Sequence, residues 1–230
     1  KFSEKNHIMT ILDKKNKIKS VILYGGTGQA KVVRPIIENQ QGANVVAIFD
    51  DTEGLKSPFE DIPIYHGFDS LIEWSKTNNI DNIGFVVCIG NPHGAKRCEI
   101  SLKIEKLGFT PYSVIDNSAV ISNNCTFGKG VQIMAGAIIM PEVKIGCFCI
   151  INTKASIDHE GRMDNGCELG PGATLCGNVM MNFNSWVAAG ATVLPNCIIG
   201  TNSIIGAGAV VTNHIDNDST YVGIPAKKIK

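Results

Sequence analysis

His159 lies between two acidic residues, Asp158 and Glu160, and it is the only one of the five histidines well inside the repetitive second half of the chain. A neutral imidazole with a pKa near working pH is suited to removing a proton from an attacking group. A carboxylate beside it can fix its tautomer and stabilise the imidazolium that forms. We therefore interpret His159 as a candidate general base supported by one of its acidic neighbours. The alternative is a solvated residue without a chemical role.

The chain around His159 has a period of six residues. From Ile115 to Val211 every sixth residue is bulky and apolar, and the residue two places before it is small or, in three repeats, valine. This spacing fits neither the period of about 3.6 residues of a helix nor the alternation of an ordinary strand. It is the hexapeptide signature of a parallel β-helix, whose axis the large residues fill. Glycine follows the large residue in five repeats, where we expect corners with positive φ: Gly128, Gly146, Gly170, Gly200 and Gly206.

Composition argues against several classes of function. The 21 Lys and Arg residues balance the 21 Asp and Glu residues of the 230-residue chain, which disfavours binding to nucleic acid or to an anionic membrane. No apolar run approaches the roughly twenty residues of a membrane span. The eight cysteines include no CxxC pair, so we expect buried free thiols in the reducing cytoplasm rather than a metal site or disulfides. Residues 1–19 are Lys-rich and lack the apolar stretch of a signal peptide, and we expect a mobile extension or leader there.

Strands and helices alternate in the first half of the chain, which predicts a small parallel sheet of the Rossmann type. The expected strands are 20–24, 44–49 and 83–89. The expected helices run from the first glycines to about Asn39, over about 69–78, and from Pro92 to about Leu107.

Each of these strands ends in residues that suit a nucleotide site. The glycine loop 25–30 would let the backbone approach a phosphate at the N-terminus of a helix. Asp50 and Asp51 follow the second strand, where a carboxylate can accept hydrogen bonds from a ribose or a base, and Gly90 follows the third. A glycine loop alone is also an ordinary tight turn. About ninety residues hold only half of a full dinucleotide fold, which disfavours NAD.

The repeats and the C-terminal residues resemble a known family. Unbroken hexapeptides followed by Tyr221-Val-Gly-Ile-Pro-Ala-Lys-Lys-Ile229 resemble the left-handed β-helix acyltransferases, whose tails commonly read V-G-x-P-A-K. With the Rossmann-like half, residues 20–230 resemble the PglD/NeuD-type sugar acyltransferases. Gly25-Gly-Thr-Gly-Gln29 is similar to their phosphate loop, although members often carry His where Gln29 stands. Residues 152–160 are similar to their N-T-x-x-x-[IV]-x-H-[ED] stretch, and residues 176–179 to their G-N-V segment.

The resemblance implies two domains and an arrangement of catalytic groups. An α/β, small Rossmann-like nucleotide-sugar-binding domain is expected at 20–112, and an all-β left-handed parallel β-helix with coils of about eighteen residues at 113–230. Such coils place His159 one coil from Gly177. The resemblance further implies that His159 is the base and that Glu160 orients it, with Asp158 as the competing candidate. Gly177 is expected to donate its N–H to a thioester oxygen, its missing Cβ leaving room for a pantetheine arm.

The resemblance also implies two sets of binding residues. Acetyl-CoA is expected along the coil edge between two subunits of a homotrimer, near Glu168, Gly177, Ala189, Gly190, Gly206 and Ala207. Some relatives carry His at the position of Glu168. The nucleotide sugar is expected to contact Thr27, Gly28, Gln29, Asp50, Asp51 and Gly90. Lys227, Lys228 and Lys230 either meet CoA phosphates or form a solvated tail.

These expectations define a function. We expect a cytoplasmic homotrimer that transfers an acetyl group directly from acetyl-CoA to the 4-amino group of a UDP- or dTDP-linked 4-amino-4,6-dideoxy sugar, for glycan biosynthesis. One alternative is sugar O-acetylation of the sialic-acid type. The other is a non-catalytic module that binds a nucleotide sugar.

Overall fold

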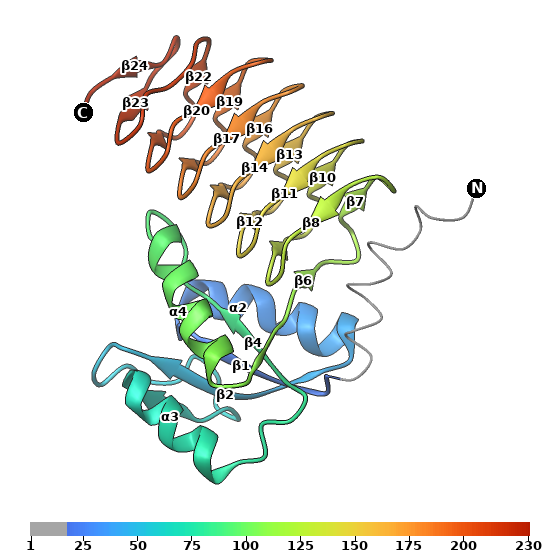
Figure 1. Cartoon of the computed structure of the whole chain (residues 1–230), viewed down its shortest axis with the longest axis vertical. Coiled ribbons are helices and arrows are strands. Elements are labelled where there is room, and N and C mark those ends of the chain that lie inside the picture. The colour runs from blue at the N-terminus through green and yellow to red at the C-terminus, as the bar shows by residue number, and fades with distance from the viewer. Residues whose placement is uncertain (1–17) are drawn as a thin grey trace.

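The computed structural model describes residues 18–230, which form a small α/β domain followed by a stack of three-sided coils (Figure 1). All but two residues of the expected extension, 1–19, therefore lie outside the described residues. Those two are part of the α/β domain. Ile18 is buried in its core, and the Lys19 carbonyl accepts a hydrogen bond from the Asn44 N–H.

The α/β domain is a five-stranded parallel sheet with the strand order β3-β2-β1-β4-β5. The strands are β1 (Ser20–Tyr24), β2 (Asn44–Asp50), β3 (Ile64–His66), β4 (Ile83–Val87) and β5 (Thr110–Pro111). The helices are α2 (Gly28–Pro35), the π-helical turn η1 (Ile36–Gln40), α3 (Gly67–Thr77) and α4 (Gly94–Lys106). The three expected strands and helices are confirmed, whereas β3 and β5 are too short to show a periodic pattern in the sequence. The α-helix ends at Pro35 because proline lacks the N–H that would continue its ladder.

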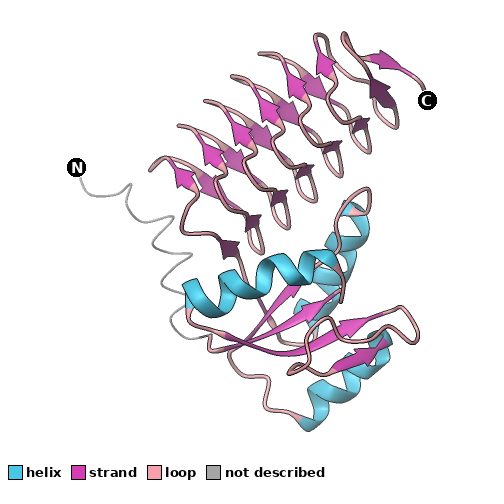
Figure 2. Cartoon of the chain, turned by 180° about the vertical axis from the view of Figure 1, so that it is seen from behind, coloured by secondary structure: helices cyan, strands magenta, loops and turns pink. Residues whose placement is uncertain are grey.

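The helices cover both faces of this sheet (Figure 2). Alternate residues of β1 point to opposite faces, so Val21 and Leu23 pack with Val33 of α2, while Ile22 and Tyr24 pack with residues of α3 and α4. This doubly covered sheet brings the carboxyl ends of β1, β2 and β4 to one edge, where the glycine loop, Asp50 and Gly90 follow.

The second part is a parallel β-helix made of three sheets. The six-stranded sheet comprises β7 (Val120–Ile121), β10 (Ile138–Ile139), β13 (Ser156–Ile157), β16 (Thr174–Leu175), β19 (Thr192–Val193) and β22 (Val210–Val211). The five-stranded coil sheet comprises β8 (Thr126–Phe127), β11 (Lys144–Ile145), β14 (Arg162–Met163), β17 (Met180–Met181) and β20 (Ile198–Ile199). The eight-stranded sheet comprises β6 (Val114–Ile115), β9 (Gln132–Ile133), β12 (Ile150–Ile151), β15 (Glu168–Leu169), β18 (Trp186–Val187), β21 (Ile204–Ile205), β23 (Thr220–Val222) and β24 (Lys227–Lys228).

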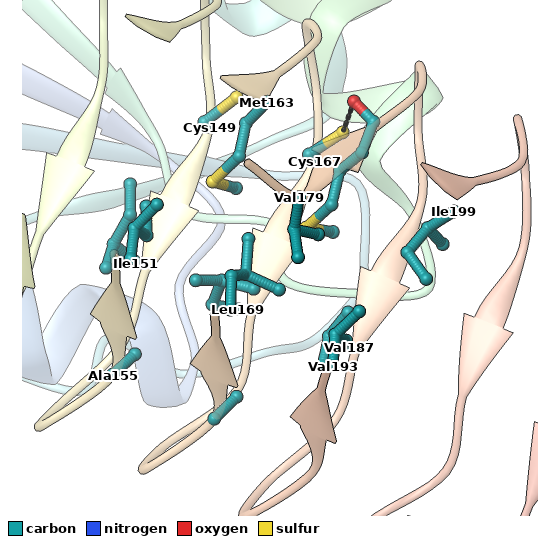
Figure 3. Packing of buried hydrophobic residues seen from close by; sticks show 14 of the residues in the cluster. Cys149, Ile151, Ala155, Met163, Cys167, Leu169, Val179, Val187, Val193 and Ile199 are labelled. Carbon is teal, nitrogen blue, oxygen red and sulfur yellow. Dashed lines mark hydrogen bonds between the residues drawn. The ribbon is translucent and has the colours of Figure 1, made fainter. Parts of the chain in front are cut away.

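The period of six residues produces the core of the coils. Ile139 pairs with Ile157 and Ile157 with Leu175, and all three are fully buried. The large residues point inward and touch those of the coils above and below, as the sticks of Figure 3 show. Each fully buried aliphatic side chain contributes about 1.5–3 kcal/mol. The axial column is only partly buried at Ile115, Ile121 and Phe127, where the stack begins.

The predicted reason for the glycines that follow the large residues is wrong. Positive φ occurs two positions later in every repeat from residue 130 to residue 208, for example at Gly130, at Gly166 and at Glu160 with φ 61°. Glycine is required at these positions because any Cβ would collide with atoms of the next coil. A Cβ on Gly128 would lie 2.5 Å from the Cys147 nitrogen of the next coil, and one on Gly170 would lie 2.5 Å from that of Ala189. Gly146, Gly200 and Gly206 are similarly crowded.

The α/β domain packs against the outward face of the eight-stranded sheet. Successive side chains along each strand of this sheet point alternately toward and away from the coil axis. Gln132, Ile150 and Glu168 point away from the axis, yet at most 7% of the surface of each is exposed. The N-terminal end of α4 is held at a coil corner, where the Ala95 N–H donates to Asn184 Oδ1 over 2.7 Å. A Cβ on Gly94 would lie 2.0 Å from the Gly166 oxygen, so only glycine allows this approach.

All eight cysteines are free thiols. Six are buried, as predicted, whereas Cys147 and Cys176 are half-buried. Within residues 18–230 no helix is long and apolar enough to cross a membrane.

Candidate active site

His159 lies at the corner that joins β13 to β14, which we call the His159 corner (residues 158–161). Its side chain is 58% exposed, and its Nδ1 lies 3.1 Å from Glu160 Oε2. Asp158 has a different partner, because its Oδ1 accepts the backbone N–H of His159 over 2.8 Å. Of the two acidic neighbours, Glu160 therefore contacts the ring, and Asp158 holds the turn.

The imidazole of His159 lies against Gly177 of the next coil. A Cβ on Gly177 would lie 2.6 Å from both Cε1 and Nε2 of that ring. The room left by the missing Cβ thus holds the imidazole, and not free space for a pantetheine arm as the sequence suggested. The Gly177 carbonyl accepts the Asn196 N–H, whereas its own N–H has no acceptor within the described residues. This N–H is a free donor beside the candidate base.

Cys176 precedes Gly177 at the same edge and is the nearest candidate nucleophile. Burial, followed by the negative charge of Asp158, raises the pKa of the Cys176 thiol above its ordinary value. A thiol with a raised pKa carries less of the reactive thiolate at neutral pH.

Four of the expected acetyl-CoA contacts lie at another corner. Ala189 and Gly190 stand between β18 and β19 at what we call the Ala189 corner (residues 188–191), and Ala207 is one coil further on. All three are exposed, and a Cβ on Gly190 would meet nothing within 4 Å. Gly206 is covered, since a Cβ there would lie 2.7 Å from Val222 Cγ1. The His159 and Ala189 corners border the two opposite edges of the six-stranded sheet.

The lysines at the end of the chain are exposed. Lys227, Lys228 and Lys230 all face solvent, and Lys228 Nζ lies 3.1 Å from Asp216 Oδ2. Lys228 is therefore partly neutralised, while Lys227 and Lys230 form no ion pair within the described residues.

The glycine loop joins β1 to α2 and exposes the N-terminus of that helix. Thr27 and Gly28 are exposed, and the Thr27 side chain does not cap the helix. Gln29 has a partner in the coils, because its Nε2 donates to Gln132 Oε1 over 2.8 Å. Gln132 in turn donates to the Val87 carbonyl over 2.9 Å. The loop therefore presents free N–H groups to solvent, while Gln29 ties it to the β-helix.

Asp50 and Asp51 differ in their surroundings. Asp50 is buried and accepts hydrogen bonds from the N–H groups of Gly26 at 2.7 Å and Thr52 at 2.8 Å, so both of its oxygens hold the loop. Asp51 is exposed and accepts the hydroxyl of Tyr24. Burial raises the pKa of Tyr24 well above its usual value, which keeps this hydroxyl a donor. Asp51 is thus the carboxylate with an oxygen free for a ligand.

Glu168 lies with Gly90 rather than at either of the two corners. Gly90 lies directly beside the carboxylate, since a Cβ there would lie 3.8 Å from Glu168 Oε1, and only 7% of Glu168 is exposed. Glu168 Oε2 lies 3.3 Å from Nη1 of Arg97, which is fully buried. Oε1 accepts Asn152 Nδ2 over 3.1 Å. Burial raises the pKa of Glu168, and the charge of Arg97 opposes this shift.

Sequence reasoning missed Arg97, which holds the two domains together. Its guanidinium donates to the carbonyls of Ile89, Phe148 and Gly166 over 2.6, 2.8 and 3.0 Å respectively. The only signal in the sequence was an arginine among the apolar residues of a helix that covers a sheet. Nothing in that pattern revealed a partner seventy-one positions away at Glu168.

The candidate base and the glycine loop of one chain lie on different sides of the coil. Gln29, Asn91 and Arg97 contact the eight-stranded sheet, whereas the His159 corner joins the other two sheets. In a three-sided coil this corner is opposite the eight-stranded sheet. A ligand on the glycine loop therefore faces away from His159 of its own chain.

Comparison with known proteins agrees with this architecture. Residues 20–99 match the model of the PglD N-terminal domain, and residues 178–213 match that of the bacterial transferase hexapeptide of six repeats. A histidine-to-alanine variant of GDP-perosamine N-acetyltransferase from Caulobacter crescentus, in complex with CoA and GDP-perosamine, is 31% identical with a TM-score of 0.84. The alignment covers 92% of this chain and 97% of that one.

Two further solved structures share the fold at lower identity. The acetyltransferase domain of PglB from Neisseria gonorrhoeae, in complex with acetyl coenzyme A, is 24% identical with a TM-score of 0.81, covering 92% of this chain and 100% of that one. WeeI from Acinetobacter baumannii is 23% identical with a TM-score of 0.81, covering 91% and 99% respectively.

The fold, the two family matches and the 31% identical Caulobacter relative define a left-handed β-helix acyltransferase. Within that class, the chain belongs to the PglD-type sugar acetyltransferases. The expected fold, family and enzyme class are therefore confirmed. Within residues 18–230, no group of three or more His, Cys, Asp or Glu residues is arranged to hold a metal ion.

Proposed function

We propose that this enzyme transfers an acetyl group from acetyl-CoA to the 4-amino group of a nucleotide-linked 4-amino-4,6-dideoxy sugar. The observation that carries the proposal is the imidazole of His159, which is paired with Glu160 and lies against Gly177, a residue whose N–H has no acceptor within the described residues. The Caulobacter relative, whose structure contains CoA and GDP-perosamine, supports both substrate classes. Because that nucleotide is a guanosine, GDP joins UDP and dTDP as a candidate carrier.

His159 acts as the general base of a direct transfer. With its Nδ1–H donated to Glu160, Nε2 accepts the proton that the amine loses as its nitrogen attacks the thioester carbonyl. The Gly177 N–H stabilises the negative charge that develops on the carbonyl oxygen. A C–N bond forms, the C–S bond breaks, and the imidazolium returns the proton to the leaving sulfur. The raised pKa of Cys176 disfavours a covalent acetyl-cysteine route.

The site is completed by a second copy of the chain. The sugar nucleotide lies on the glycine loop of one subunit, with Thr27, Gly28 and Gln29 at its diphosphate and Asp51 at the ribose or base. Its amine reaches His159 of a neighbour, since its own His159 is on the other side of the coil. The exposed side chains of Val120 and Ile138, 61% and 41% accessible, suit burial in such an interface.

A closed ring of such contacts gives the homotrimer. It brings the His159 corner of one subunit toward the Ala189 corner of the next, where exposed Ala189, Gly190 and Ala207 leave a path for acetyl-CoA. Eight free thiols are consistent with a reducing cytoplasm.

Mass spectrometry of reaction products tests the proposed function. The enzyme is incubated with acetyl-CoA and GDP-perosamine, with UDP- and dTDP-linked 4-amino-4,6-dideoxy sugars, and with free sialic acid. We expect a CoA-dependent N-acetyl product from at least one nucleotide amino sugar and none from sialic acid. Product from sialic acid alone would indicate O-acetylation, and binding without product would indicate a non-catalytic module.

A further inference from the structure

Three buried polar atoms near Glu168 have no hydrogen-bond partner within the described residues. They are Nδ2 and Oδ1 of Asn91 and Nε1 of Trp186. A buried donor or acceptor that stays unpaired costs about 1–3 kcal/mol. Such atoms are rare in folded proteins, and their gathering at one place indicates a polar ligand.

The chain topology brings both Asn91 and Trp186 next to Glu168. Asn91 follows Gly90 at the carboxyl end of β4, and its backbone N–H donates to the Glu168 carboxylate. Trp186 occupies the position of Glu168 on the adjacent strand, because β15 and β18 pair in register at these residues. The two residues that carry the unpaired atoms thus adjoin Glu168, where the edge of the α/β sheet meets the eight-stranded sheet.

The chemistry of this patch suits a hydroxylated or aminated ring. Asn91 offers one donor group and one acceptor, and Trp186 offers a donor on a large apolar ring. A hydroxyl can pair with either kind of group. A phosphate offers only acceptors, so it would leave Asn91 Oδ1 without a partner. The patch therefore fits a sugar better than the diphosphate of a nucleotide or of CoA.

We propose that Asn91 and Trp186 form the subsite for the hexose, with Glu168 beside them. This inference rests on the proposed function and names the residues that recognise its sugar. Trp186 Nε1 donates to an oxygen of the hexose, and the Asn91 amide pairs with a neighbouring hydroxyl. Glu168, expected from the sequence to meet acetyl-CoA, instead faces the sugar beside Gly90.

Tryptophan fluorescence tests the subsite directly, because Trp74 and Trp186 are the only tryptophans in the chain. Trp74 lies on α3 and contacts the rings of Phe49 and Phe109, so Trp74→Phe retains an aromatic ring there. In that variant Trp186 is the only indole. We expect its emission to change on adding GDP-perosamine, or the accepted UDP- or dTDP-linked sugar, and not on adding GDP, UDP, dTDP or acetyl-CoA.

A second variant measures the contribution of the indole N–H. Trp186→Phe removes that donor, and we expect calorimetry to show a dissociation constant for the nucleotide sugar about tenfold higher. The dissociation constant for the matching nucleoside diphosphate should stay unchanged, as should both constants in the control Trp74→Phe.

The outcomes separate the subsite from the proposed function. If the wild-type protein binds the nucleotide sugar and Trp186→Phe binds it equally well, the subsite is wrong while the function stands. If Trp186→Phe weakens binding of the nucleotide sugar and of the nucleoside diphosphate equally, the subsite is also wrong. If the wild type binds none of the nucleotide sugars, the proposed function itself fails.

Discussion

The imidazole of His159 covers Gly177, and a Cβ on that glycine would lie 2.6 Å from His159 Nε2. The side chain of His159 therefore packs directly on the backbone of Gly177, one coil further along the chain. Glycine at this position permits the ring to lie over the next coil, and the ring lies beside a free backbone N–H. The pairing predicts how the site responds to a single methyl group.

Gly177→Ala should displace the imidazole without unfolding the coils. We expect kcat to fall about 10- to 100-fold, because small displacements of a catalytic group are costly. Steady-state kinetics, with circular dichroism as a check of folding, measures this. The neighbouring substitution Cys176→Ala is the control and should keep kcat within about twofold of wild type. Equal activity of the two variants would contradict the fit between His159 and Gly177.

Glu160 and Asp158 should differ in their effects on turnover. Glu160→Gln removes the charge that lies 3.1 Å from Nδ1, and we expect kcat to fall about tenfold or more. Asp158→Asn retains an oxygen that can accept the His159 N–H, and we expect turnover close to wild type. If Asp158→Asn proves the more damaging change, the roles are reversed.

The reactivity of Cys176 should depend on pH in a defined direction. A raised pKa means that less thiolate is present at a given pH, so alkylation by iodoacetamide should be slower than that of free cysteine at pH 7. The rate should still rise with pH where free cysteine has levelled off. Asp158→Asn removes one cause of the shift and should accelerate labelling. Mass spectrometry of the peptide containing Cys176 reports the rate, and labelling faster than free cysteine would contradict the account.

Mixed oligomers should regain activity if two chains build each site. Gly28→Asp places a carboxylate in the glycine loop, where a Cβ meets nothing within 4 Å, so the fold should tolerate it while a phosphate is repelled. Neither Gly28→Asp nor His159→Ala alone should be active. Refolding or co-expressing them together should restore about one quarter of wild-type turnover in randomly assembled trimers.

One control variant tests whether the charge of Gly28→Asp, and not its size, blocks binding. Gly28→Asn, which adds a side chain of similar size without its charge, should bind the nucleotide sugar more tightly than Gly28→Asp. Mixed oligomers that form and stay inactive would place the whole site within one chain.

The sequence predicted the coils well because their core depends on local spacing. Ile139, Ile157 and Leu175 recur at a fixed period, and each meets the next in the folded coil. The corner glycines were misinterpreted because their constraint is not local. Gly128 is required by the nitrogen of Cys147 in the coil above, whereas positive φ falls at Gly130.

The residues at the domain junction were harder to predict for the same reason. Glu168 occupies an ordinary outward position in its hexapeptide, and its surroundings come from Arg97 and Gly90 of the other domain. Asp50 and Asp51 look equivalent in the sequence, yet only the folded loop shows that Asp50 is committed to Gly26 and Thr52. The spacing in the sequence predicts which residues face the coil axis, whereas the partners of outward residues such as Glu168 depend on contacts between the two domains.

Turnover of the His159→Ala variant tests the central claim most directly. Acetyl transfer from acetyl-CoA to the accepted nucleotide sugar is measured by mass spectrometry, alongside light scattering for the oligomeric state. We predict a loss of about 10²- to 10⁴-fold in kcat with the oligomer and nucleotide-sugar binding intact. Turnover near the wild-type value in a correctly assembled variant would contradict the role of His159 as the base.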